Sequence, residues 1–344
     1  MNILSLPLML AAFASYSAEK PSYTLINASL PAKASIYAGT GPGPAPGRRE
    51  LVVLTYNIHG LPWPISKGGR KRAFKAIGEQ LGAMRREGRA PDIVLIQEGF
   101  EDIRELVQLS GYRYWAAGPQ KGDRSDPDEM PDAGGFARVR YPTSGEGWGK
   151  LTSSGLHVLS DFPIMAVEEE PYAYCAGWDC LANKGVMMVH VDVPGVPGGV
   201  DVATTHLNSW DTAKVPTERS LMAHHLQLDE MTTFIDRHRS GGAPLIVGGD
   251  FNVEGSPECY YYKAKARPFT VVSEFCQQSS AACTSQLRTD VPEPWLRSED
   301  LQAFAPGGPV AVRPRDVRMI FDNLDGRRLS DHDGYVVRYE LSWR

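Results

Sequence analysis

Two short polar segments carry side chains suited to chemistry on a charged substrate. Asp250 and Asn252 follow Gly248 and Gly249, which let the backbone turn tightly at the end of an apolar run. A carboxylate and an amide oxygen at such a position suit a hard cation or a phosphate group. A turn in which the same side chains cap the strand would use the same residues, and for this segment alone the two interpretations have equal weight.

His332 stands in the second segment, between Asp331 and Asp333. Neighbouring carboxylates raise the pKa of an imidazole and orient its ring, so this position predicts a general base. His206 ends another apolar run and has no adjacent acid. We therefore predict that His206 is a general acid or a donor to phosphate. Either histidine taken alone is more often structural.

Glu98 ends a third apolar run, residues 92–98. Mg²⁺ keeps several of its waters and needs only one or two carboxylates from the protein. A single glutamate delivered by a buried strand is therefore how a magnesium site with few protein ligands would be built. The alternative is a solvated residue where a strand meets a loop.

An alternating set of strands and helices must position these groups. Four apolar runs of strand length end in polar residues, and they are 51–56, 92–98, 200–206 and 244–250. Apolar residues at helical spacing predict helices over 71–87 and 217–238. A last strand pair is predicted at 317–321 and 334–341. The alternation indicates an α/β or α+β fold.

The composition supports a large folded body. The chain has 344 residues, of which 42% are hydrophobic, so it can bury a sizeable core as one large or two small domains. Its formal net charge of -5 provides no general attraction to a phosphate backbone. Nucleic acid is therefore disfavoured as a substrate, although a locally basic groove could exist.

The N-terminus has the features of an exported protein. Leu4 to Ala14 is apolar and is followed by small residues, which predicts a signal peptide over 1–18 and a secreted or periplasmic protein. The run lacks a basic start and is too short for a permanent membrane anchor. Residues 19–49 are rich in Pro and Gly and are predicted to be a leader or linker. A single folded domain is expected over 50–344.

Five cysteines fit an oxidising compartment. Cys175 and Cys180 are close in sequence, as are Cys276 and Cys283, and such pairs could close as disulfides, which would leave Cys259 over. The alternative is a set of small buried hydrophobes, and the sequence does not fix the connectivity. Residues 119–155 are dense in Gly, Pro and Asp, and they predict a long surface loop that covers a site or moves.

Taken in order, the polar segments resemble the signature of the endonuclease/exonuclease/phosphatase superfamily, which includes DNase I and the neutral sphingomyelinases. The resemblance covers residues 50–344 and implies a four-layered sandwich of two packed mixed β-sheets flanked by helices, with the site at one edge. The segments that carry it are Thr55-Tyr56-Asn57, Gln97-Glu98, Thr205-His206-Leu207-Asn208, Gly249-Asp250-Phe251-Asn252 and Ser330-Asp331-His332.

The resemblance implies a metal site and a phosphate site. Glu98 would bind Mg²⁺ with help from Asn57, and Asp331 would support the metal side; Mn²⁺ or Co²⁺ are alternatives. Asn252 would hold a phosphate oxygen, and Asn208 is placed on the same phosphate-binding side.

The resemblance also implies acid–base roles. His332 would activate the attacking water, and Asp316 would be the acid that orients this histidine. Asp250 would position or deprotonate the water. His206 would contact phosphate or protonate the leaving group.

Two further segments are similar to elements of sphingomyelinases. They are Ser154 to Ile164 and Trp178 to Val186. This second resemblance implies substrate-side roles for Asp179, Asn183 and Lys184, with Lys184 supplying a point charge for phosphate. It implies a monomeric, magnesium-dependent hydrolase that cleaves a phospholipid headgroup at a membrane surface by in-line attack of water, with no stable protein partner.

Two other functions remain as alternatives. In a secreted DNase I-like nuclease, basic residues such as Arg70, Arg72 and Arg315 would line a groove for a nucleic acid backbone, although a solvated helix face is the favoured interpretation of the first two. A binding protein on the same fold would require the loss of a catalytic group, and none is lost. Secreted bacterial sphingomyelinases commonly carry a long aromatic hairpin, and Phe321 to Arg328 is too short and too charged for one.

Overall fold

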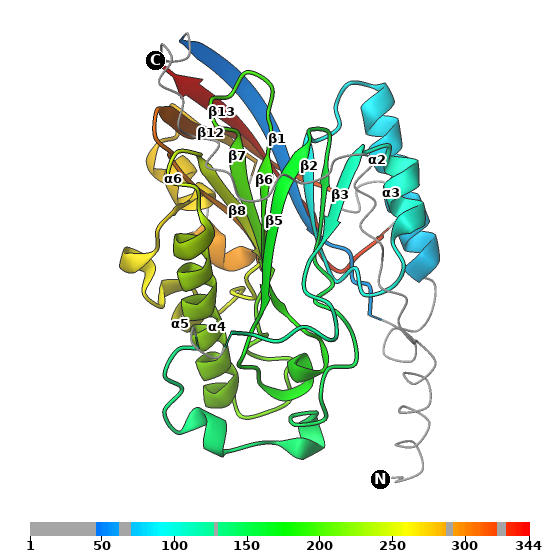
Figure 1. Cartoon of the computed structure of the whole chain (residues 1–344), viewed down its shortest axis with the longest axis vertical. Coiled ribbons are helices and arrows are strands. Elements are labelled where there is room, and N and C mark those ends of the chain that lie inside the picture. The colour runs from blue at the N-terminus through cyan, green and yellow to red at the C-terminus, as the bar shows by residue number, and fades with distance from the viewer. Residues whose placement is uncertain (1–45, 62–69, 127–129, 287–291, 322–327) are drawn as a thin grey trace.

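The computed structural model describes residues 46–61, 70–126, 130–286, 292–321 and 328–344. The signal peptide predicted over 1–18 lies outside these ranges, as does nearly all of the predicted leader. Two β-sheets pack face to face, and helices cover their outer faces (Figure 1). The prediction of a four-layered sandwich is confirmed.

The first sheet has seven strands in the order β10-β12-β13-β1-β2-β4-β3. β1 lies near its centre, antiparallel to β13 and parallel to β2. The bounds are β1 Gly47–Asn57, β2 Ile93–Gln97, β3 Tyr114–Ala117, β4 His157–Ser160, β10 Thr284–Ser285, β12 Val310–Ile320 and β13 Gly334–Trp343.

The second sheet has six strands in the order β5-β6-β7-β8-β11-β9. β7 and β8 run parallel, and β11 runs antiparallel to β8. The bounds are β5 Ile164–Pro171, β6 Gly185–Val191, β7 Val200–His206, β8 Leu245–Asp250, β9 Thr270–Val271 and β11 Asp300–Ala305.

The helices bury their apolar faces against the two sheets. α2 (Arg70–Arg86) and α3 (Arg104–Ser110) cover the first sheet, and α4 (Thr217–His238) covers the second (Figure 1). Shorter helices α5 (Pro257–Tyr261) and α6 (Val272–Gln278) follow β8. None of the helices among the described residues is long and apolar enough to cross a membrane.

The middle of strand β1 shows why residues 51–56 are largely apolar. Leu51 and Val53 face the second sheet, whereas Leu54 and Tyr56 face the helical layer. All four side chains are buried. A strand segment that is covered on both faces favours a nearly continuous apolar run, which is the pattern that this part of the sequence shows.

The predicted elements are observed, with shifted ends. α4 has the predicted bounds, and α2 begins and ends one residue earlier than predicted. β1 begins at Gly47, three residues before the predicted start of the folded body, because Gly47 still pairs with Trp343. β12 and β13 are both longer than predicted.

Both predicted cysteine pairs are disulfides, Cys175 with Cys180 and Cys276 with Cys283. Cys259 is free and buried. Apart from residues 127–129, which lie outside the described ranges, the segment 119–155 consists of turns and short 3-10 helices. Glu146 anchors this segment to α4, because both of its carboxylate oxygens accept hydrogen bonds from Arg219 at 2.7 Å.

The topology brings four polar strand ends to one edge of the sandwich. Asn57 at the end of β1 is opposite Gln97 at the end of β2, and His206 at the end of β7 is opposite Asp250 at the end of β8. Because the strands of each pair are parallel, their carboxyl ends lie together. The edges of the two sheets meet here, since Asn57 contacts Asp250.

Candidate active site

Asn57 joins the two sheets at the site. Its Nδ2 donates to Oδ2 of Asp250 at 2.9 Å and to Oε1 of Glu98 at 3.2 Å. All three side chains are buried or nearly so. The structure therefore brings together three of the residues that the sequence predicted for metal and water.

Glu98 is an unusual carboxylate in two respects. Its backbone has a left-handed φ of 57°, which turns the chain sharply after β2. Its Oε2 is buried and has no hydrogen-bond partner among the described residues. Burial raises the pKa of this group. A buried carboxylate oxygen without a donor is what a bound cation would satisfy.

Asp331 lies beside the end of β1. Its Oδ2 is 2.6 Å from Nδ1 of His59, and the hydroxyl of Ser330 donates to the carbonyl of Asn57 at 2.7 Å, which ties this segment to β1. Burial opposes ionisation, but His59 and His332 lower the pKa of Asp331 to about 2. Carboxylates such as those of Asp331 and Glu98 are ligands that a hard divalent cation takes, whereas the amide oxygen of Asn57 accepts from the backbone of His59 at 2.9 Å. The contact of His59 with Asp331 was not predicted, because no acidic residue stands next to His59 in the sequence.

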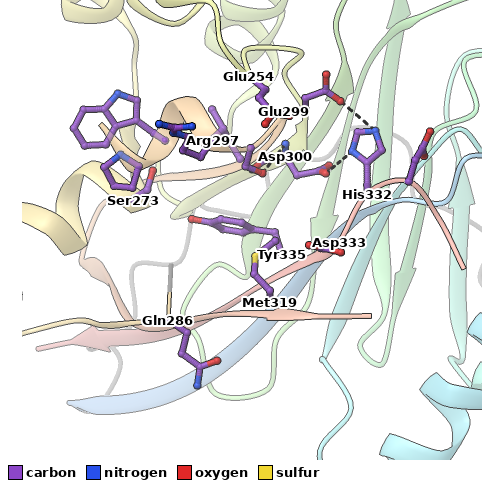
Figure 2. Close-up of a pocket in the computed structure, with 15 residues that line it drawn as sticks. Glu254, Ser273, Gln286, Arg297, Glu299, Asp300, Met319, His332, Asp333 and Tyr335 are labelled. Carbon is purple, nitrogen blue, oxygen red and sulfur yellow. Dashed lines mark hydrogen bonds and ion pairs between the residues drawn. The ribbon is translucent and has the colours of Figure 1, made fainter. Parts of the chain in front are cut away.

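His332 is surrounded by carboxylates (Figure 2). Nδ1 lies 2.7 Å from Oδ2 of Asp300, and Nε2 lies 3.2 Å from Oε2 of Glu299 and 4.0 Å from Oδ2 of Asp250. Burial would lower the pKa of His332, but the three carboxylates, Asp300 foremost, raise it to about 11. The imidazole is thus protonated at neutral pH in this environment.

The predicted orienting acid was wrong. Asp316 lies half-buried in β12 of the first sheet, in register with Arg338 and Thr284, and the acid at Nδ1 of His332 is Asp300. Asp300 is opposite Asp250 because β11 pairs antiparallel with β8. That long-range pairing delivers Asp300 to the site, and the local sequence around Asp316 does not reveal it.

Glu299, next to Asp300, was also missed. Burial, followed by the charge of Asp250, raises its pKa to about 8. Asp250, Glu299 and His332 each present a ligand atom, and these atoms lie within 4.8 Å of one another. The trio could hold a second cation. The available signal was an acidic pair directly before the apolar run 301–305, as Asp331 and Asp333 stand before the last strand.

His206, like His332, lies close to Oδ2 of Asp250. Its Nε2 lies 3.3 Å from Oδ2 of Asp250 and 3.0 Å from Nζ of Lys184. Burial, with Lys184 contributing, lowers the pKa of His206 to about 4, so the ring is neutral at pH 7. Lys184 also lies 3.0 Å from Oδ2 of Asp179. The predicted residues Asp179 and Lys184 are therefore part of the site.

Three predicted asparagines have partners within the fold. Asn252 has a left-handed φ of 49°, and its Nδ2 donates to the carbonyl of Leu207 at 2.9 Å. The amide oxygen of Asn208 accepts from the backbone of Ala176. Asn183 donates to the carbonyl of Gln120. Asn252 stays beside Asp250, whereas the amide groups of Asn183 and Asn208 hold neighbouring loops and do not reach the site.

A pocket of about 340 Å³ opens beside His332 (Figure 2). It lies between β11, β13 and the short 3-10 helix Pro294–Arg297. Glu299, Asp300 and Asp331 also line it. Because His332 itself lines the pocket, part of a molecule bound at His332 can occupy it.

A comparison with protein families fits this geometry. Residues 54–271 match the sequence profile of the family described as Endonuclease/Exonuclease/phosphatase family. The chain belongs to this family. The matched range holds four of the five segments that suggested the resemblance, and Ser330-Asp331-His332 follows it.

Curated relatives include sphingomyelinases. A sphingomyelinase of Mycobacterium tuberculosis is 28% identical over 211 residues, which is 61% of this chain and 35% of that protein. Sphingomyelin phosphodiesterase 5 of Danio rerio is 26% identical over 277 residues, which is 73% of this chain and 47% of that protein. The chain thus spans less than half the length of these relatives.

Solved structures share the fold. Sphingomyelinase C from Streptomyces griseocarneus aligns with a TM-score of 0.54 at 18% identity, covering 84% of this chain and 99% of that one. A substituted beta toxin from Staphylococcus aureus with bound magnesium ions aligns with a TM-score of 0.55 at 16% identity, covering 84% and 99%. At these identities, the two alignments show a shared fold.

Proposed function

We propose that this member of the family is a metal-dependent phosphodiesterase that cleaves the headgroup of sphingomyelin or a related phospholipid. The observation that carries the proposal is the placement of Asp250 between His332 and His206, with Asn57 linking it to Glu98. A phosphodiester bound there would meet an ionised carboxylate, two histidines and a lysine. The similarity to sphingomyelinases supports the choice of lipid.

Glu98, Asn57 and Asp331 would hold the divalent cation, which we propose is Mg²⁺. Bound there, such a cation neutralises the charge that develops on the phosphoryl and leaving oxygens. The unpartnered Oε2 of Glu98 supports this assignment.

Asp250 is the group we assign to receive the proton of the attacking water. His206, His332 and Lys184 together outweigh burial and hold its pKa below the usual value, so the carboxylate is ionised at neutral pH. His332 carries a proton in this environment, and its Nε2–H would donate to a phosphate oxygen. This assignment differs from the sequence prediction, in which His332 was the general base.

His206 and Lys184 would bind the phosphate from the opposite side. Because burial and Lys184 keep His206 neutral at pH 7, contact with phosphate is favoured over protonation of the leaving group. Lys184 supplies the positive charge, and Asp179 holds it in place. Asn252 would supply a further polar group next to Asp250.

We further propose that residues 50–344 form one catalytic domain that acts as a monomer in a secreted or periplasmic setting. β1 and β13 come from the two ends of this range and pair with each other in the first sheet, which supports a single domain. The two disulfides fit an oxidising compartment.

A four-substrate assay tests the proposed function. Purified protein with Mg²⁺ is given sphingomyelin vesicles, phosphatidylcholine vesicles, plasmid DNA and an inositol phosphate. We expect release of phosphocholine from sphingomyelin. Cleavage of DNA alone would assign the protein to the nuclease branch instead.

A further inference from the structure

The pocket beside His332 has an acidic wall. Glu254, Glu299, Asp300 and Asp333 line it, and Arg297 is the one Lys or Arg side chain among the described lining residues. Asp300 is 2% exposed, and its Oδ1 has no hydrogen-bond partner among the residues that the structure describes. An anionic group would be repelled from this pocket, whereas a cation would be attracted.

The rest of the wall is aromatic and apolar. Trp295 lines the pocket and stacks on Tyr260, with ring centroids 5.8 Å apart and planes at 22°. Leu301, Met319 and Tyr335 also line the pocket. Aromatic faces combined with carboxylates are the usual surroundings of a quaternary ammonium ion, which has no hydrogen to donate and binds through charge and cation–π contact.

We propose that this pocket binds the cationic ammonium end of the substrate headgroup, and that the carboxylate of Glu254 in its wall selects the headgroup by its charge. The inference rests on the proposed phosphodiesterase function. His332 lies in the wall of the pocket, so a phosphate ester held by its Nε2 would place a short substituent of the phosphorus there. The pocket volume of about 340 Å³ accommodates a trimethylammonium group.

The test compares two soluble esters with the same leaving group. One is p-nitrophenyl phosphorylcholine, and the other is a neutral analogue in which carbon replaces the nitrogen of choline. The two share size, shape and phosphoryl centre, so a difference in kcat/KM measures recognition of the positive charge. We expect the wild-type protein to prefer the choline ester about tenfold, which corresponds to about 1.4 kcal/mol.

Variants locate that preference. Glu254 is exposed, so Glu254→Gln should fold normally, and it should reduce the choline-to-neutral ratio about two- to fivefold, as expected for a partly solvated charge. Glu258→Gln is the matched control, since Glu258 is exposed, close in sequence and absent from the pocket wall; it should keep the wild-type ratio.

A binding measurement separates this inference from the proposed function. Titration calorimetry in EDTA with phosphocholine, and with its neutral carbon analogue, needs no turnover. Tighter binding of phosphocholine that weakens in Glu254→Gln supports the pocket even if sphingomyelin is not cleaved. Equal binding of the two, or equal cleavage of the two esters by an active enzyme, overturns it. In a parallel titration without EDTA, displacement of phosphocholine by added Mg²⁺ would also overturn it, because the carboxylates of the pocket wall would then form a metal site.

Discussion

Nδ1 of His332 lies 2.7 Å from Oδ2 of Asp300. The pair forms because β11 returns antiparallel to β8 and places Asp300 opposite Asp250, at the edge where the final motif of the chain arrives. This contact fixes the imidazole ring and keeps Nε2 directed toward Asp250 and Glu299. His332 and Asp300 are therefore expected to act as a unit.

Replacement of Asp300 by Asn should lower turnover roughly 10- to 100-fold, because a hydrogen bond to a charged group contributes about 1.5–3 kcal/mol. The pKa of His332, followed by NMR titration, should fall from about 11, because Asp300 is the carboxylate that raises this pKa most. Asp316→Asn is the matched control and should change neither quantity. An equal loss in both variants would show that the effect comes from the fold.

Replacement of Glu98 by Gln should weaken Mg²⁺ binding and also stabilise the metal-free protein. The buried carboxylate of Glu98 has an unpartnered oxygen, and a neutral amide there removes the cost of burying an unpaired charge, about 1–3 kcal/mol. Calorimetric titration with Mg²⁺ measures the first effect, and Tm in EDTA measures the second. A variant that binds Mg²⁺ as tightly as wild type would remove Glu98 from the metal site.

Replacement of Asn208 by Ala should destabilise the fold more than it affects chemistry. Its amide oxygen accepts from the buried backbone of Ala176, and loss of this partner costs about 1–3 kcal/mol in the free energy of unfolding. Urea unfolding measures the loss. A stable variant with a greatly raised KM would instead return Asn208 to the substrate side.

Glu230 on α4 should make the protein less stable as the pH rises. Burial, against the opposing hydrogen bond from the backbone of Ala173, raises the pKa of Glu230 to about 8 from 4.5. The folded protein therefore holds this proton more tightly than the unfolded chain, and the resulting stability is lost between pH 4.5 and about 8. Glu230→Gln should flatten this part of the stability–pH curve by up to about 5 kcal/mol. Glu218→Gln, an exposed position on the same helix, should leave the curve unchanged.

The sequence contained enough to predict the architecture and the strand ends. Buried strands are marked by continuous apolar runs, and the polar residue that ends each run is local information, so Asn57, Glu98, His206 and Asp250 were found. Asp300 and Glu299 were missed because their place in the site depends on the pairing of β11 with β8, which no local pattern encodes.

Two of the predicted asparagines show a different limit, which is that a motif alone does not reveal the role of its residues. Asn183 and Asn208 stand in motifs typical of the family, but their side chains hydrogen-bond to backbone groups of Gln120 and Ala176. Motif membership indicates that a residue is needed, and the three-dimensional partners decide whether it serves chemistry or structure.

Release of phosphocholine from sphingomyelin vesicles tests the central claim most directly. We expect turnover with Mg²⁺, loss of turnover in EDTA, and a fall of roughly 10²- to 10³-fold in folded His332→Ala, as for removal of a hydrogen-bond donor to the reacting phosphate. Full activity in EDTA, or near-normal turnover by that variant, would contradict it.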